Sequence, residues 1–228
     1  MGKDNGRGRH GRVLVINPNS TEAVTQGIDA AMAPFRFADG PAFDCVTLPD
    51  GPPGIETQRH VDSVVGPICT LIAREDNAAD AFVIACFSDP GLLSARETTR
   101  KPVFGIGAAS YSAALLLGER FGVIAILPAS VERQRRAVRM LGLDVRYAAS
   151  LPVGIGAASL DGDAVAERMI EVGRSLIDEH GADVLILGCA GMAAHRETVE
   201  QALGVPVIDP TQAAAAQAVA AIRVAGRP

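Results

Sequence analysis

The 228-residue chain contains no tryptophan, and its aromatic residues amount to only 4% of the sequence. Its formal net charge is −5. The sequence therefore has neither the basic surface that binds phosphate backbones nor the aromatic platforms on which bases stack. We do not expect a protein that binds nucleic acid.

Long apolar runs are also missing. No segment approaches the roughly 20 apolar residues that a transmembrane helix needs. Residues 1–11, MGKDNGRGRHG, are basic and glycine-rich and lack the apolar stretch of a signal peptide. We expect a cytoplasmic protein with no membrane partner, in which residues 1–11 form a disordered tail.

Cysteine, histidine and lysine are scarce. The four cysteines are too scattered for a disulfide scaffold, and no C-x-x-C motif or histidine pair indicates a metal site. The four histidines, His195 among them, fit solvated surface positions. The only lysines are Lys3 and Lys101, so no well-placed amine is available for a pyridoxal Schiff base. The sequence predicts a protein that needs neither a metal nor a cofactor.

Short β-branched runs bounded by turn residues alternate with stretches of helical periodicity. This alternation indicates βα units built around parallel sheets. We expect a last helix near 210–224 and strands near residues 12–17, 43–48, 81–86, 102–106, 121–127, 146–151, 183–188 and 205–208.

The two halves of the sequence repeat one design. DAFVIAC ends at Cys86 and DVLILGC ends at Cys189, and the same interval separates these cysteines from Pro49 and Pro152. We interpret the match as an internal duplication. It predicts an α/β protein of two pseudo-symmetric lobes, each a parallel, flavodoxin-like sheet flanked by helices. The N-terminal lobe would comprise residues 12–107 plus 211–228, and the C-terminal lobe residues 108–210.

Cys86 and Cys189 both come at the predicted carboxyl end of a strand, where parallel sheets bind ligands. A single cysteine on an apolar strand is more often a packing residue, and we read Cys45 and Cys69 in that way. Cys86 and Cys189 recur at equivalent strand ends, which favours a chemical role for both. The positive end of a helix that follows each of them would favour the thiolate form over the thiol. If the lobes face each other, one thiolate can remove a proton from carbon while the opposite thiol supplies one, which inverts a stereocentre.

Polar residues near these strand ends have more than one reading. Asn17 ends the first strand beside the expected cleft, where its amide could bind a substrate. Asp89 followed by Pro90 has the form of a helix N-cap. Asn19 with Glu22 resembles a capping box.

Four segments carry a resemblance to a known family: INPNS at 16–20, GPPGIE at 51–56, ACFSDPGL at 85–92 and LGCAGM at 187–192. They resemble motifs of the Asp/Glu/hydantoin racemase superfamily, and within it the hydantoin racemase and allantoin racemase branch. The resemblance implies a cofactor-free isomerase with its active site between two lobes and with Cys86 and Cys189 as the two bases. It also implies a substrate site lined by Asn17, Ile55, Phe87, Ser88, Ala190 and Gly191.

The residues after the cysteines bear on the substrate. Amino-acid racemases of the superfamily carry Asn-Thr and Thr-His after their cysteines, whereas this chain has Phe87-Ser88 and Ala190-Gly191, which suit a neutral ring. We therefore expect a racemase of 5-substituted hydantoins or a related cyclic ureide. Ala108 or Ala109 stands where these relatives often carry Glu or Gln, so the exact substrate stays open.

Other functions also stay open. Allantoin racemase and Asp/Glu racemase are the alternatives within the superfamily. A dithiol redox protein and a non-catalytic ligand-binding protein come from other classes, and the absence of a C-x-x-C motif disfavours the redox protein. The expected partner is a small-molecule substrate, and the sequence leaves a homo-oligomer open.

Overall fold

The computed structural model describes residues 11–160 and 162–224. It contains two four-stranded parallel sheets, with strand orders β2-β1-β3-β4 and β6-β5-β7-β8. The two orders are equivalent, which confirms the two-lobed α/β class and the predicted strands, with ends shifted by a few residues. The strands are β1 Arg12–Asn17, β2 Ala42–Thr47, β3 Ala81–Ile84, β4 Val103–Gly105, β5 Phe121–Ala125, β6 Tyr147–Pro152, β7 Val184–Leu187 and β8 Val207–Ile208.

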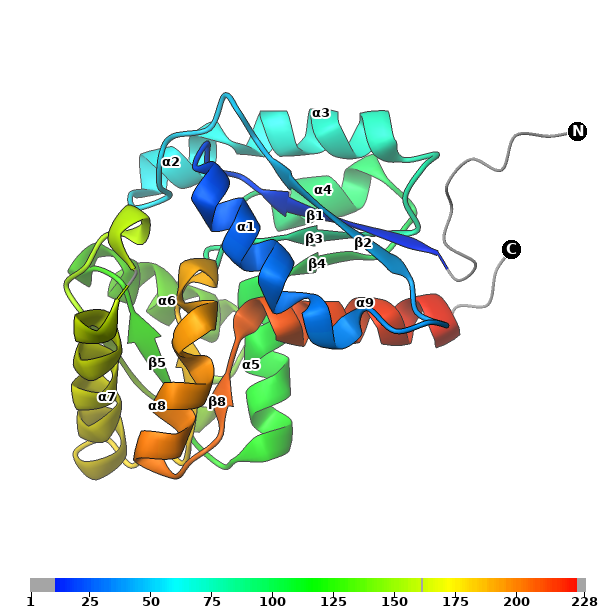
Figure 1. The fold of residues 1–228 in the computed structure, drawn as a ribbon. Helices are drawn as coiled ribbons and strands as arrows, with labels where there is room; N and C mark the ends of the chain where they lie inside the picture. The colour runs from blue at the N-terminus through cyan, green and yellow to red at the C-terminus, as the bar shows by residue number, and fades with distance from the viewer. Residues whose placement is uncertain (1–10, 161, 225–228) are drawn as a thin grey trace, which may run out of the picture.

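Helices cover both faces of each sheet (Figure 1). The α-helices are α1 Glu22–Ala31, α2 Gln58–Ser63, α3 Val65–Glu75, α4 Leu92–Thr98, α5 Ile106–Leu117, α6 Pro128–Met140, α7 Asp163–Asp178, α8 Arg196–Leu203 and α9 Pro210–Val224. The short 3-10 helices are η1 Ala33–Phe35, η2 Asp144–Arg146, η3 Ala157–Ser159 and η4 Ala190–His195. Of the helices in the described part of the chain, none is long and apolar enough to cross a membrane.

Strand β1 shows why the central strands are continuous apolar runs. Val13 and Val15 pack on the side of α1 and α9, whereas Leu14 and Ile16 pack on the side of α3. Since helices cover both faces of the sheet, every residue of the run is withdrawn from water. The equivalent strand β5 is buried along its whole length.

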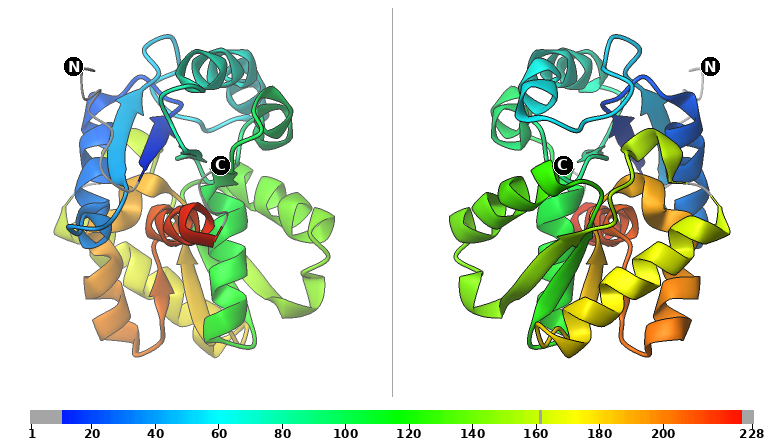
Figure 2. Two further views of the ribbon diagram at one scale, coloured as in Figure 1. Left: turned by 90° about the vertical axis from the view of Figure 1, so that its right-hand side faces the viewer. Right: turned by 90° about the vertical axis from the view of Figure 1, so that its left-hand side faces the viewer.

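Helices α5 and α9 exchange lobes. Helix α5 follows β4 of the first sheet, yet its Tyr111 and Ala114 pack against the second sheet. Helix α9 follows β8 of the second sheet, yet its Ala214 and Ala218 pack against the first. The two helices pack against each other and cross at a steep angle (Figures 1 and 2), and Gln217 Nε2 of α9 donates to the Ala109 carbonyl at 3.0 Å. The lobes are thus joined through this helix pair. The lobe boundaries given above stay a prediction.

The beginning of the chain is described only from Gly11. This residue is buried, and its carbonyl accepts the Ala42 N–H at 2.9 Å, so it opens the β1–β2 pair. The rest of the predicted tail, residues 1–10, lies outside the described residues.

The predicted cap at Asp89 is wrong. Helix α4 begins at Leu92 after Gly91, and the Asp89 carboxylate accepts the N–H groups of Gly107 (2.8 Å) and Ala108 (2.7 Å) at the start of α5. A Cβ on Gly105 would lie 2.3 Å from the carboxyl carbon, so glycine there permits the approach. Asp89, at φ 46°, thereby ties the turn after Cys86 to the helix that joins the lobes.

The predicted capping box at Asn19 and Glu22 is also wrong. The N-cap residue of α1 is Thr21, and no side chain caps this helix. Asn19 Oδ1 accepts the Thr21 N–H at 2.9 Å, so the side chain stabilises the turn that precedes the helix.

Asp89→Asn should flatten the dependence of stability on pH. Burial raises the pKa of Asp89 to about 7, above that of an aspartate in the unfolded chain, so the folded state loses stability as the pH rises from about 4 to 7. The asparagine carries no such charge. Urea titrations at pH 4.5 and 8.5 should therefore show a smaller fall in the free energy of unfolding for the variant than for the parent.

Asp183→Asn is the matched control. Asp183 also accepts two N–H groups, of Glu119 and Arg120 at 2.9 Å each, but it is exposed, and against the effect of desolvation these bonds lower its pKa. Because Asp183 is charged in the folded and the unfolded chain over most of this range, Asp183→Asn should leave the fall in the free energy of unfolding between pH 4.5 and 8.5 nearly unchanged. A fall as steep in Asp89→Asn as in Asp183→Asn would contradict the buried charge assigned to Asp89.

Candidate active site

Cys86 and Cys189 occupy equivalent turns of the two lobes. Each follows the end of a central strand by two residues, after β3 in one lobe and after β7 in the other. The Cys86 carbonyl accepts the Asp89 N–H at 2.9 Å, and the Cys189 carbonyl accepts the Met192 N–H at 3.1 Å. The duplication seen in the sequence therefore extends to the geometry of both turns.

Both cysteines line one cavity between the lobes, with a volume of about 40 Å³. The wall on the N-terminal side consists of Asn19, Val24, Ile55, Ala85, Phe87 and Ser88. The wall on the C-terminal side consists of Ile126, Ser130, Arg133, Gln134, Ala157, Gly188 and Ala190. The cavity is mostly apolar, with a few polar groups at defined places, as small-molecule sites usually are.

The structure brings together most of the expected site residues. Ile55, Phe87, Ser88 and Ala190 line the cavity with the two cysteines, and Ile55 reaches it from the loop at 51–57. Gly191 lies on an adjoining groove, and its backbone N–H hydrogen-bonds to the Cys189 thiol. The roles of these residues toward a substrate stay predictions.

Asn17 is placed differently. It is fully buried and does not line the cavity. Its Nδ2 donates to Asn19 Oδ1 at 3.1 Å and to Thr25 Oγ1 at 2.9 Å, and its Oδ1 accepts the Asn19 N–H at 3.2 Å. Because these bonds occupy both ends of the amide, the geometry favours an indirect role in which Asn17 positions Asn19.

Burial controls the ionisation of both thiols. It raises the pKa of Cys86 to about 12 and the pKa of Cys189 to about 11. The Ser88 and Gly191 N–H groups oppose this rise by hydrogen-bonding to the sulfur atoms. The expected help from a helix start is absent at Cys86, because α4 begins only at Leu92. Burial therefore favours the protonated form of both thiols, contrary to the expectation from the sequence.

The charges around the two thiols differ. The Arg133 guanidinium lowers the pKa of Cys86, against the effect of burial, whereas the Glu56 carboxylate adds to the rise in the pKa of Cys189. A negative charge on Cys189 also raises the pKa of Cys86. The two thiols consequently titrate as a coupled pair, in which ionisation of one opposes ionisation of the other.

Helix α6 supplies three cavity residues that the sequence analysis missed: Ser130, Arg133 and Gln134. The run VERQRR has the composition of a solvated helix face. The sequence did contain one signal for this placement. Pro128 aligns with Pro18 in the duplication, and Asn19, the residue after Pro18, lines the cavity. The duplication therefore predicts that the segment after Pro128 also lies at the cleft.

His195 is not the solvated residue that the sequence predicted. It is only partly exposed at the end of η4, and its Nε2 lies 2.8 Å from the Leu160 carbonyl. This contact holds η4, which follows Cys189, against the segment at 157–160.

The loop at 51–57 closes the cavity across the lobes. Glu56 Oε1 accepts the Ala157 N–H at 3.1 Å, and Arg133 Nη2 donates to the Glu56 carbonyl at 2.9 Å. The space between these contacts is about 40 Å³, which holds no more than a few water molecules, since each needs roughly 10–15 Å³. A substituted ring needs more room between the thiols than this arrangement leaves.

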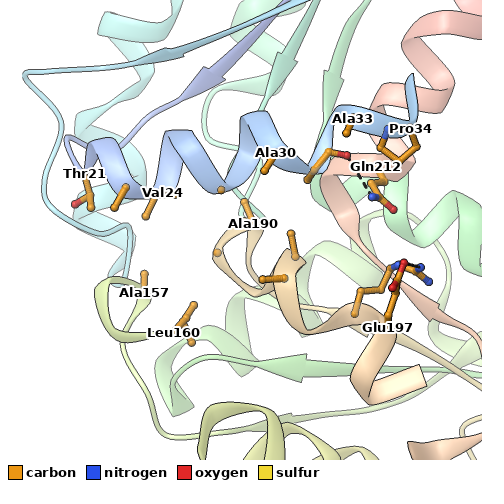
Figure 3. Close-up of a pocket in the computed structure, with 17 residues that line it drawn as sticks. Thr21, Val24, Ala30, Ala33, Pro34, Ala157, Leu160, Ala190, Glu197 and Gln212 are labelled. Atoms are coloured by element: carbon orange, nitrogen blue, oxygen red, sulfur yellow. Dashed lines mark hydrogen bonds and ion pairs between the residues drawn. The ribbon is translucent and has the colours of Figure 1, made fainter. Parts of the chain in front are cut away.

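A second, larger cavity of about 410 Å³ runs along α1 and η4 (Figure 3). It shares Val24, Ala157 and Ala190 with the cysteine cavity. Its lining is mostly alanine and glycine, and its charged residues Arg196 and Glu197 pair with each other at 3.2 Å. The groove adjoins the site and offers space, but neither Cys86 nor Cys189 lines it. Within the described residues, no cluster of three or more His, Cys, Asp or Glu side chains could hold a metal ion.

Comparisons with known proteins agree with this geometry. A family model described as Asp/Glu/Hydantoin racemase matches residues 13–218. The chain is 37% identical over 201 residues to a hydantoin racemase of Pseudomonas sp. (strain NS671), covering 87% of this chain and 80% of that protein. It is 35% identical over 207 residues to a hydantoin racemase of Paenarthrobacter aurescens, covering 89% and 87%. The solved structure of allantoin racemase from Klebsiella pneumoniae matches with a TM-score of 0.88 at 31% identity, covering 94% of this chain and 88% of that one.

The raised pKa values of Cys86 and Cys189 predict how the thiols react with iodoacetamide. Below its pKa, the thiolate fraction of each cysteine rises about tenfold per pH unit, so alkylation should keep accelerating between pH 7 and 10. Mass spectrometry of each labelled peptide measures the rates. A rate that levelled off below pH 9, as for an exposed thiol, would contradict the buried assignment.

Proposed function

Because the chain belongs to the Asp/Glu/hydantoin racemase family, we infer that it is a racemase that interconverts the enantiomers of 5-substituted hydantoins or closely related cyclic ureides. The observation that carries this inference is the pair of thiols that equivalent turns of two lobes bring to one small cavity. Opposite lobes can present the two thiols to opposite faces of a flat ring.

The proposed reaction needs one thiolate and one thiol at the same time. The thiolate of one cysteine removes the proton from the stereocentre, and the electron pair of the broken C–H bond moves onto the neighbouring carbonyl oxygen. The thiol of the other cysteine then delivers its proton to the opposite face of the same carbon. The roles of Cys86 and Cys189 are exchanged after each turnover, so the reverse reaction uses the same two groups.

The cavity supports a neutral ring over an amino acid. Phe87 and Ala190 give it an apolar lining, and among the described residues that line it only Arg133 is basic. An amino acid carries an ammonium group and a carboxylate, both of which would have to be desolvated and paired. Allantoin, also a cyclic ureide, remains the nearest alternative, since allantoin racemases are among the similar structures.

A reversible disulfide is the alternative from another class. In the structure both thiols are free. The curated relatives at 35–37% identity are named hydantoin racemases, which favours the racemase over a redox protein.

Polarimetry of the purified protein should show loss of optical rotation with single enantiomers of 5-methylhydantoin, 5-benzylhydantoin or allantoin. Aspartate and glutamate should keep their rotation, because none of the described residues that line the cavity is acidic and could pair their ammonium group. Rapid racemisation of either amino acid with none of the ureides would overturn the proposed substrate class.

The same activity should survive exhaustive dialysis against EDTA, because thiol-to-carbon proton transfer uses no metal ion. Polarimetry before and after dialysis measures this. Activity that disappeared and returned with zinc, or that required pyridoxal phosphate, would contradict the mechanism.

A further inference from the structure

Helix α6 presents an unpaired donor and an unpaired acceptor at the cysteine cavity. Arg133 Nε and Gln134 Oε1 are buried and have no hydrogen-bond partner, although both residues line the cavity. Leaving a buried donor or acceptor unpaired is costly, because the group has lost its hydrogen bonds to water. Two such groups on adjacent residues of a ligand cavity indicate a ligand that presents an acceptor beside a donor.

The two side chains lie along the wall that links the cysteine turns. A Cβ on Gly188, the residue before Cys189, would lie 3.0 Å from Gln134 Nε2, so the Gln134 amide sits against the Cys189 turn. The Arg133 guanidinium lies close enough to Cys86 for each to shift the pKa of the other. A ring held between the thiols would therefore have these two side chains at its edge.

Arg133 also carries a positive charge without a negative partner. None of the ion pairs between described residues includes it. Its Nη2 donates to the Glu56 carbonyl at 2.9 Å and to Ser130 Oγ at 3.3 Å, both of which are neutral. The charge is therefore available to an anion that forms in the cavity.

Removing a proton next to a carbonyl creates such an anion. The negative charge develops on the carbonyl oxygen, and a donor fixed at that oxygen lowers the barrier. The backbone N–H groups of Ser88 and Gly191 are already bonded to the thiols. A donor for the carbonyl oxygen must come from another part of the wall.

We propose that Arg133 and Gln134 together recognise one edge of the substrate ring. Arg133 Nε–H donates to the carbonyl oxygen beside the stereocentre, and Gln134 Oε1 accepts the ring N–H next to that carbonyl. This assignment rests on the racemase function proposed above. As the cysteine takes the proton, the electron pair moves to the oxygen and the guanidinium stabilises it, and the pair returns to carbon when the second thiol delivers its proton. Arg133 is thus a catalytic residue, and Gln134 selects rings with an unsubstituted N–H at that position.

Arg133→Gln and Arg133→Lys test the first half of the proposal, with single enantiomers of 5-methylhydantoin as the probe. Loss of an oxyanion donor typically lowers kcat about 10²–10³-fold. The kcat of Arg133→Gln should therefore be lower than that of the parent by this factor, and the kcat of Arg133→Lys should be lowered less. Arg136→Gln is the matched control on the same helix, because Arg136 is exposed and does not line the cavity. The kcat of Arg136→Gln should stay within about twofold of the parent value.

A kcat for Arg133→Gln within about threefold of the parent, with both proteins folded by circular dichroism, would overturn the role of Arg133. The rate at which iodoacetamide labels Cys86 separates this role from a simple effect on the thiol. The proposal expects racemisation to fall far more than labelling. Equal falls in both rates would show that Arg133 acts only through Cys86, and would also overturn the proposal.

Gln134→Leu tests the second half. The parent protein should racemise 5-methylhydantoin much faster than the analogue that is also methylated at the ring nitrogen between the two carbonyl groups. That analogue has no N–H there and leaves Gln134 Oε1 unpaired. Gln134→Leu should remove most of this discrimination. A parent protein that racemised both compounds equally would refute the role of Gln134. A parent that racemised no cyclic ureide would instead refute the proposed function, so the two failures are distinguishable.

Discussion

Two thiols that share one small, buried cavity form the constraint on which the rest of the structure depends. Burial raises the pKa of Cys86 to about 12 and that of Cys189 to about 11, and a charge on one raises the pKa of its partner. The pair can therefore hold one negative charge more readily than two. That state, with one thiolate and one thiol, is the state that proton transfer across a ring requires.

The fold brings the thiols together by duplication and by exchange of helices. Equivalent sheets supply equivalent turns, and α5 and α9 each cross to the opposite lobe and pack on one another. Asp89 ties the Cys86 turn to the start of α5, and His195 ties the end of η4 to the segment at 157–160. The loop that carries Glu56 then bonds to both Arg133 and Ala157. The cavity is thus fixed by contacts from both lobes, which explains why it is small.

Much of this was predictable from sequence, because repeated patterns carry it. The apolar runs before Cys86 and Cys189 indicated both the parallel sheets and the paired cysteines. The failures involve contacts distant in the sequence. Asp89 matched a local capping pattern, yet its partners are Gly107 and Ala108, 18 and 19 residues away. Arg133 lies within a charged run, and only its position in three dimensions distinguishes it from its exposed neighbour Arg136. The degree to which burial raises the thiol pKa values also depends on packing that no local pattern encodes.

Hydrogen exchange at the stereocentre tests the central claim, that two cysteines act from opposite faces. In Cys86→Ser and in Cys189→Ser, racemisation should fall about 10²–10⁴-fold, because each variant lacks one of the two acid–base groups. The remaining cysteine should still exchange the proton for deuterium from D2O in a single enantiomer, with retention of configuration. NMR of each pure enantiomer with each variant should show opposite preferences. Exchange of the same enantiomer by both variants, or unchanged racemisation in either, would contradict the account.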